Sequence, residues 1–343
     1  MAYDKPNAAT SVTATADVAM AVMKAFGINT MSTTAKSAAS VGGARLRVAL
    51  AIDVTGSMDS DGKMEATQTA TKSLIDQLQQ AGSANGDVYV SLVPFNKNVN
   101  IGNTNSSASW LNWSTWDDKN GTCRNSSGST RSKSSRSSCM NDSSSNTWTP
   151  KAHSTWNGCV MDRNQNFDTT ATIPTSIDTN SYFPTEQYSS CPAQMMQLTN
   201  DFTALKTKVD ALWPDGNTNQ SIGFVWAWQT LVGGAGMTVP AEESGYNYEY
   251  IIIHMSDGLN TQNRWYSDAS DIDARQKIAC DNAKAAGFTI YTVQVDTGND
   301  GEAAALAYCA SDNMKFKIAK NAPQILATFD QIGNGMNKAR LSE

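Results

Sequence analysis

The chain has 343 residues and a formal net charge of −6. This length is enough for one large or two ordinary domains with a buried core. This acidic net charge argues against nucleic acid as the main partner, because nucleic acids require a basic face. No stretch is long and apolar enough to cross a bilayer, and residues 1–10 lack the basic-then-apolar pattern of a signal peptide. We expect the chain as given to be soluble, with any export signal or membrane anchor lying outside it.

The first 44 residues form an N-terminal segment rich in Ala, Thr and Ser. Within it, Val18, Val22 and Phe26 recur every four residues and Gly27 follows. Apolar residues at this spacing, closed by a glycine, predict a short amphipathic helix over residues 15–27.

From residue 45 onwards, the pattern alternates between strands and helices. The predicted strands cover 46–53, 87–95, 248–258, 288–296 and 315–318. The predicted helices run from Lys63 to Gly82, over 198–212, from the 215–219 turn to 231, over 271–287 and 303–308, and from Pro323 onwards. This order predicts a Rossmann-like α/β fold with a mostly parallel central sheet flanked by helices. Functional sites of such sheets form at the carboxyl ends of strands, where Asp53 and Asp257 stand.

Residues 96–197 interrupt this alternation with a Ser-, Asn-, Thr- and Trp-rich stretch that holds four cysteines and five tryptophans. Loops of this length are either functional or disordered. The cysteines and tryptophans predict a large insertion tied by disulfides, with the tryptophans packed in a small core rather than stacked on sugars. Residues 124–138 offer no apolar face, so we predict a solvated loop with little regular structure there.

The six cysteines stand at positions 123, 139, 159, 191, 280 and 309. None forms a Cys-x-x-Cys pair, and two histidines are too few to support a structural zinc site. We predict disulfides and an oxidising compartment; the alternative is scattered reduced thiols in a cytosolic protein. Cys280, on a helix, and Cys309, after the next strand and short helix, can be neighbours in space and are predicted to pair. Cys123–Cys139 and Cys159–Cys191 are weaker predictions, because six cysteines allow about fifteen pairings.

The stretch "DVTGSM", which begins at Asp53, allows several interpretations. Asp53 could be a phosphorylated nucleophile, as in P-type ATPases and their Mg-dependent, HAD-like phosphatase relatives. Val54 stands where those ATPases have lysine, and Thr55 stands where the soluble phosphatases place a second acid. The aspartic-protease pattern needs contiguous Asp-Thr-Gly, and here Val54 separates Asp53 from Thr55. In a purely structural interpretation, Asp53 caps a turn and Ser57 caps the following helix.

A further interpretation is a metal site that resembles the metal-ion-dependent adhesion site (MIDAS) of von Willebrand factor A (vWA) domains. That site has Asp-x-Ser/Thr-x-Ser after the first strand, then a threonine in a later loop, then an aspartate after a central strand. The residues that match it, in order, are Asp53, Thr55, Ser57, Thr218 and Asp257.

The resemblance implies a Mg²⁺ site, with Mn²⁺ or Ca²⁺ as alternatives, in a vWA domain spanning 45–343 and interrupted by 96–197. Magnesium prefers six oxygen ligands and retains waters readily. An ion held partly by neutral hydroxyls keeps positive charge and can take an acidic side chain from a partner protein. We expect a binding module rather than an enzyme, because neither histidine belongs to the motif. His254 is expected in the packing layer of its strand. Asp59 and Asp61 are either solvated loop acids or attractors of cations.

A narrower resemblance is to TadG-type proteins of the bacterial tight-adherence (Flp) pilus system. It rests on "WNGCVMDR" (156–163), "YFPTEQYSSCP" (182–192) and "CDNAKAAGFTIYTVQVD" (280–296). It implies an extracytoplasmic adhesion module, in the periplasm or at the cell surface, that acts in pilus assembly or attachment with pilus or envelope components as partners. The membrane-anchoring helix with which that family usually begins is absent from this chain. The alternative is an intracellular vWA scaffold of an ATPase-linked assembly, similar to relatives of magnesium chelatase.

Overall fold

The computed structural model describes residues 2–4, 9–19, 30–40, 44–82, 86–298 and 301–342. Its centre is an eight-stranded sheet in the order β11-β6-β5-β4-β14-β15-β16, with β13 also paired to β5. The five parallel strands are β4 (Arg45–Asp53), β5 (Val88–Phe95), β14 (Tyr248–Ser256), β15 (Thr289–Val295) and β16 (Phe316–Ala319). The three antiparallel strands are β6 (Val99–Asn100), β11 (Cys159–Val160) and β13 (Met196–Thr199). The predicted α/β class with a mostly parallel sheet is confirmed.

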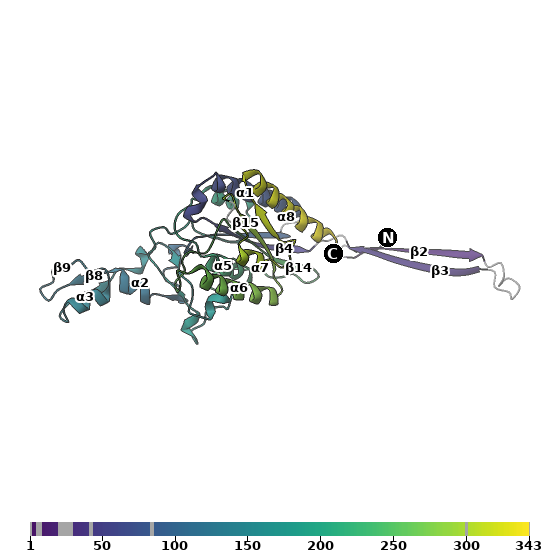
Figure 1. Cartoon of the computed structure of the whole chain (residues 1–343). Helices are drawn as coiled ribbons and strands as arrows, with labels where there is room; N and C mark the ends of the chain where they lie inside the picture. Colours follow the sequence, from purple (N-terminus) through teal and green to yellow (C-terminus); the bar gives the residue numbers. More distant parts are fainter. Residues whose placement is uncertain are drawn as a thin grey trace.

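Helices cover both faces of the sheet (Figure 1). One face carries α1 (Lys63–Ala81), α4 (Phe202–Asp210) and α8 (Ala322–Ser342). The other face carries α5 (Gln220–Val232), α6 (Ala269–Ala285) and α7 (Ala304–Cys309). Each face has its own apolar cluster because side chains alternate along the strands: in β4, Leu50 and Ile52 join the α1 side, and Ala49 and Ala51 join the α5 side.

The helix α5 packs unusually close to the sheet. Every residue from Gln220 to Leu231 is buried. A Cβ at Gly223 would lie 2.3 Å from the ring of Phe95, so glycine is required at this approach. The loop that enters α5 is therefore held at a fixed depth against the end of β5.

One helix prediction is wrong at its start. Leu198 belongs to β13, which pairs with β5, and α4 begins only at Phe202. Asp201 caps α4, because its carboxylate accepts a hydrogen bond from the Ala204 amide at 2.9 Å. The four-residue step from Leu198 does not mark a shared face, because Leu198 joins the α5-side cluster whereas Leu205 and Val209 join the α1-side cluster.

The 96–197 segment contributes β6, β11 and part of β13 to the central sheet and extends outwards as a small lobe (Figure 1). Its remaining strands are β7 (Leu111–Asn112), β8 (Gly121–Arg124), β9 (Thr130–Arg131), β10 (Thr147–Pro150) and β12 (Phe183–Pro184). Its helices are α2 (Ser114–Lys119) and α3 (Arg136–Asp142). Its 3-10 turns are η3 (Asn103–Asn105), η4 (His153–Thr155), η5 (Phe167–Thr169) and η6 (Thr179–Ser181).

The stretch 124–138 is mostly exposed and mostly outside helices and strands, as predicted, but it is not without regular structure. It contains β9 and the first turn of α3. Polar side chains replace an apolar face here. Asn125 Oδ1 accepts from the Ser129 amide at 2.8 Å, and Ser135 forms a capping box with Ser138. Such local side-chain bonds stabilise turns and helix starts without burial.

The tryptophans of the segment pack as predicted, but in two places. Trp116 and Trp156 are each 1% exposed and join the apolar cluster on the α5 side of the sheet, with Trp110 and Trp113 against it. Trp148 packs separately, with the Cys123–Cys139 disulfide. The segment is therefore part of the main core as well as an outward lobe.

All three predicted disulfides are present: Cys123–Cys139, Cys159–Cys191 and Cys280–Cys309. The last joins α6 to the end of α7 across a sequence separation of 29 residues. Closing a loop of that length stabilises the fold by roughly 3–4 kcal/mol in the chain-entropy model.

The N-terminal segment differs from its prediction. It contains β1 (Ala2–Asp4), β2 (Ala9–Ala19) and β3 (Thr30–Ser40), paired as an antiparallel sheet. The helix predicted over 15–27 is wrong for 15–19, which pair with β3; its remainder, 20–27, lies outside the described residues. Valine and threonine are stiff at χ1 and favour strands, and cross-strand pairing outweighs the four-residue repeat. Among the described residues, no helix has the length and apolar character needed to span a membrane.

His254 lies in the packing layer of β14, as predicted. Its ring is fully buried, stacks on Phe95 at 5.3 Å between centroids and meets Phe224 edge-on at 5.9 Å. Neither ring nitrogen has a hydrogen-bond partner. Burial lowers the pKa of His254 to about 3, so the imidazole is neutral in the folded protein.

This burial predicts sensitivity to acid. Between pH 6.5 and about 3, the unfolded chain binds a proton at His254 that the folded chain does not, so stability falls as pH falls through this window. In urea unfolding at pH 7 and pH 4.5, the wild type should lose about 2–3 kcal/mol more than His254→Leu, which has no titrating group there. Equal losses in the two proteins would contradict a neutral buried imidazole.

Candidate metal centre

Two carboxylates leave the sheet side by side at its carboxyl edge. The strands β4 and β14 are parallel neighbours, with Ile52 opposite Met255. Asp53 ends β4, and Asp257 directly follows β14. Because parallel strands end at the same edge, residues far apart in the sequence meet here.

Asp53 is fully buried and both of its carboxylate oxygens are bonded. Its Oδ1 accepts from the Thr55 amide at 2.8 Å, and its Oδ2 accepts from the Ser256 hydroxyl. Burial raises the pKa of Asp53 to about 7, and the nearby Asp257 charge adds to the rise. Asp53 therefore does cap a turn, as the structural interpretation predicts, but as a buried carboxylate beside a second one.

The two hydroxyls of the motif connect the carboxylates. The Thr55 and Ser57 hydroxyl oxygens lie 3.0 Å apart, and the Ser57 hydroxyl donates to Asp257 Oδ1 at 2.7 Å. Ser57 sits in the 3-10 turn η2 (Gly56–Asp59), and α1 begins later, after Gly62. The prediction that Ser57 caps the following helix is therefore wrong: its side chain turns towards Asp257 instead.

Lys63 is a member of this cluster that the motif does not include. Its ammonium lies 2.7 Å from Asp257 Oδ2 and 3.1 Å from the Ser57 carbonyl oxygen. The side chains of Lys63 and Asp257 are 11% and 1% exposed. Lys63, the first residue of α1, thus places one positive charge against Asp257, beside Asp53. Its position shortly after the motif, at the start of a helix, was the available sequence signal.

The loop that carries Thr218 is bonded to the motif through backbone groups. The Gly56 amide donates to the Gly216 carbonyl at 3.0 Å, and the Asp215 amide donates to the Val54 carbonyl at 2.9 Å. The Thr218 amide donates to the hydroxyl of Thr261, in the loop after β14, at 2.8 Å. Residues 215–219, which we call the threonine loop, are thus hydrogen-bonded to the loops after both β4 and β14. Hydrogen bonds join the other four motif residues, with Asp53 reached through the Thr55 amide. Among the described residues, no hydrogen bond joins the Thr218 hydroxyl to these four, so its loop alone is brought to the cluster.

The cluster consists of hard oxygen donors. In the part of the chain that the structure describes, no group of three or more His, Cys, Asp or Glu side chains is placed to hold a metal. The two carboxylates and the hydroxyls of Thr55 and Ser57 suit Mg²⁺, Ca²⁺ or Mn²⁺, which prefer oxygen, rather than a tetrahedral nitrogen or sulfur site. Asp59 and Asp61 are exposed loop acids outside the hydrogen-bonded cluster. A buried Asp53 with both oxygens bonded is poorly placed to act as a nucleophile.

Known proteins match this chain in fold but not in sequence. No family model and no curated protein sequence matches the chain. The vWF domain of the type V pili tip protein Mfa5 from Porphyromonas gingivalis matches with a TM-score of 0.51 and 13% identity, over 87% of this chain and 97% of that one. The fold is of the von Willebrand factor A type.

Other solved structures give weaker matches to this vWA fold. The pilus adhesin SpaC of Lactobacillus rhamnosus GG matches with a TM-score of 0.46 and 12% identity, over 90% of this chain and 32% of that one. Proximal thread matrix protein 1 from the mussel byssus, solved with a zinc-occupied MIDAS motif, matches with a TM-score of 0.43 and 11% identity, over 87% of this chain and 48% of that one.

We predict that replacing Lys63 lowers the stability of the metal-free protein, measured in EDTA, by a large amount. Lys63→Met leaves two buried carboxylates without this counter-charge, so the free energy of unfolding should fall by about 3 kcal/mol. Lys72→Met is the matched control on the same helix, because Lys72 and its partner Asp210 are 35% and 60% exposed; it should cost less than about 1 kcal/mol. Urea unfolding measures the free energy of unfolding of the wild type and both variants. Equal losses in the two variants would contradict the claim that Lys63 stabilises the buried carboxylates.

Proposed function

We propose that this chain is a metal-dependent adhesion module of the bacterial envelope, TadG-like, that acts in pilus assembly or surface attachment. In this proposal, residues 45–343 form one vWA domain interrupted by 96–197. Asp53, Thr55, Ser57, Thr218 and Asp257 hold one divalent ion, most plausibly Mg²⁺, at the carboxyl edge of the sheet.

The observation that carries the proposal is the hydroxyl–carboxylate cluster itself. Thr55, Ser57 and Asp257 are linked by short contacts, and Asp53 is held rigidly between the Thr55 amide and the Ser256 hydroxyl. Two buried carboxylates repel each other unless positive charge lies between or beside them. A bound divalent ion would supply that charge.

The balance of charge explains why such a site would bind a partner rather than only an ion. With an ion bound, Asp53 and Asp257 would carry two negative charges, and Lys63 offsets one of them through its contact with Asp257. A divalent ion would leave the centre with a net positive charge. A carboxylate from a partner protein would complete the balance, and the hydroxyls of Thr55, Ser57 and Thr218 would orient the ion without neutralising it.

Three disulfides support an extracytoplasmic location, because disulfides persist in oxidising compartments. They also disfavour the intracellular scaffold of an ATPase-linked assembly. Mfa5, whose vWF domain shares this fold, is a pilus tip protein, and this agrees with the TadG resemblance of the sequence. We infer that the partners are pilus or envelope proteins that present an acidic side chain.

Calorimetry tests the metal centre. The wild type should give binding heat with Mg²⁺, Mn²⁺ or Ca²⁺, and Asp53→Ala should give none, because the buried carboxylate that offsets the ion is gone. In EDTA, Asp53→Ala should unfold close to the wild-type temperature, since removing one of two neighbouring acids relieves repulsion. Asp59→Ala, which removes an exposed acid in the same loop, is the control and should bind as the wild type does. Absence of heat with all three ions in the wild type would overturn the metal centre.

Thr218→Ala tests whether the ion serves partner binding. The variant loses one neutral ligand, so it should keep measurable Mg²⁺ affinity but retain less partner in a pull-down from envelope extract. EDTA should abolish the wild-type pull-down. Partner retention that is equal in wild type, Thr218→Ala and EDTA would indicate binding through another surface, such as the 96–197 segment.

A further inference from the structure

Asn219, which follows Thr218, connects the loop of the proposed metal centre to the 96–197 segment by hydrogen bonds. Asn219 is fully buried and caps α5, with its Oδ1 accepting from the Ile222 amide. Its amide nitrogen Nδ2 points the other way and donates to both carboxylate oxygens of Asp162, at 3.1 and 2.9 Å. Because Asn219 is adjacent to Thr218, whatever holds Asn219 also restrains the backbone of Thr218, from which the hydroxyl projects.

Asp162 is itself held firmly. It is 5% exposed, and Oδ2 also accepts from the Arg264 amide at 3.2 Å. Asp162 follows β11 closely, and the Cys159–Cys191 disulfide anchors that strand. A buried carboxylate that accepts several hydrogen bonds is a rigid anchor, because moving it would leave charge unsatisfied.

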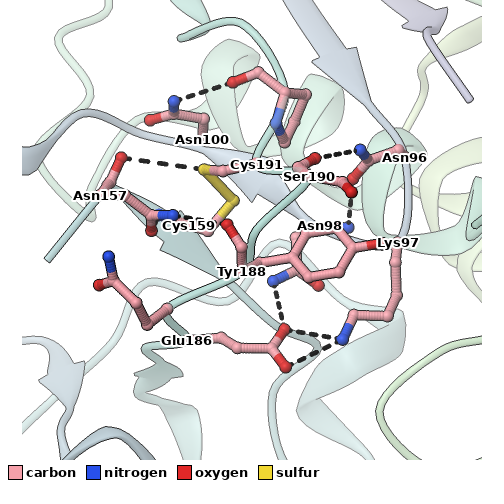
Figure 2. Close-up of a disulfide and its surroundings, with 12 residues drawn as sticks. Asn96, Lys97, Asn98, Asn100, Asn157, Cys159, Glu186, Tyr188, Ser190 and Cys191 are labelled. Atoms are coloured by element: carbon pink, nitrogen blue, oxygen red, sulfur yellow. Dashed lines mark hydrogen bonds and ion pairs between the residues drawn. A yellow bond between two sulfur atoms is a disulfide. The ribbon is translucent and has the colours of Figure 1, made fainter. Parts of the chain in front are cut away.

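A second path from the same disulfide reaches the threonine loop, and Figure 2 shows its first contact, between Ser190 and Asn96 beside the Cys159–Cys191 disulfide. Ser190 precedes Cys191, and its carbonyl accepts from Asn96 Nδ2 at 2.6 Å. The same Asn96 nitrogen donates to the Asp215 carbonyl at 2.9 Å, and the Asn96 carbonyl accepts from the Asn219 amide at 3.2 Å. Asn96 is fully buried, so it joins the disulfide-tied stretch to both ends of the threonine loop.

An ion pair reinforces this contact. The Lys97 ammonium lies 2.9 Å from Glu186, and Asn98 Nδ2 donates to the same carboxylate at 2.6 Å (Figure 2). The Lys97 carbonyl in turn accepts from Asn219 Nδ2 at 3.3 Å. The threonine loop is thus enclosed between the sheet edge on one side and the 96–197 segment on the other.

We propose that Asp162 is a positioning residue of the metal centre: through Asn219 it holds the Thr218 hydroxyl in place, so that the 96–197 segment sets the affinity for the ion. This inference rests on the proposed function and deepens it. Partners that support a metal ligand commonly change affinity by about 10–100-fold when they are removed.

Asp168 provides a matched control. It is also an acid of the 96–197 segment and also 5% exposed. Its carboxylate pairs with Arg275 of α6 and makes no hydrogen bond to Asn219 or the threonine loop among the described residues. Removal of Asp168 therefore tests the general cost of losing a buried acid from this segment.

The experiment titrates Mn²⁺ and Mg²⁺ by calorimetry into wild type, Asp162→Ala, Asp162→Asn and Asp168→Ala. Asp162→Ala should bind about 10-fold or more weakly. Asp162→Asn keeps an amide oxygen for Asn219 and should recover most of the affinity, while Asp168→Ala should bind within about twofold of wild type. In a Thr218→Ala background, Asp162→Ala should cause no further loss, because the two residues act through one hydroxyl.

A second readout needs no ion. In EDTA, amide hydrogen exchange over residues 216–221 should be faster in Asp162→Ala than in wild type and unchanged in Asp168→Ala. If the wild type binds ions and Asp162→Ala binds equally well, the inference fails and the metal centre stands. Additive losses in the Thr218→Ala background would likewise overturn it. If the wild type binds no ion, the proposed function fails and the inference with it.

Discussion

The constraint on which the candidate site depends is the parallel pairing of β4 with β14. It brings Asp53 and Asp257 to one edge of the sheet, where their side chains are almost wholly buried. Two carboxylates in such a place are unfavourable unless neighbouring groups offset their charge. The composition of the surrounding loops follows from this requirement: hydroxyls from Ser57 and Ser256 donate to the acids, and Lys63 contributes an ammonium.

The same arrangement makes the cluster suitable for cation binding. Hydroxyl groups donate hydrogen bonds to carboxylates, and their oxygens can also face a cation. In the proposed metal centre, Ser57, which donates to Asp257, and Thr55, which contacts Ser57, would turn their oxygens to the ion while the backbone keeps its course. In the proposed metal centre, Lys63 would limit how much negative charge faces the ion, and this would favour moderate affinity with residual positive charge. A strongly acidic site would hold the ion more tightly but would have less attraction for a partner's carboxylate.

The 96–197 segment is more closely built into the fold than its polar sequence suggests. It adds strands to the central sheet, and Trp116 and Trp156 pack into the α5-side core. Its buried acid Asp162 and the Cys159–Cys191 disulfide meet the threonine loop from outside the sheet. Asn219 therefore connects this segment to the loop of the proposed metal centre.

The sequence by itself determined the α/β class and the order of the main strands and helices, because hydrophobic periodicity is a local pattern. Its strand-end acids also pointed to the five motif residues that we propose as metal ligands. It also predicted all three disulfides. It did not reveal Lys63 or Asp162 as neighbours of the motif, and it predicted helix at 15–19 and 198–201, where strand pairing and a capping aspartate prevail. These features depend on contacts between residues far apart in the chain. Only the tertiary structure decides them, because pairing energy and burial arise when distant segments meet, and no local pattern records which segments those are.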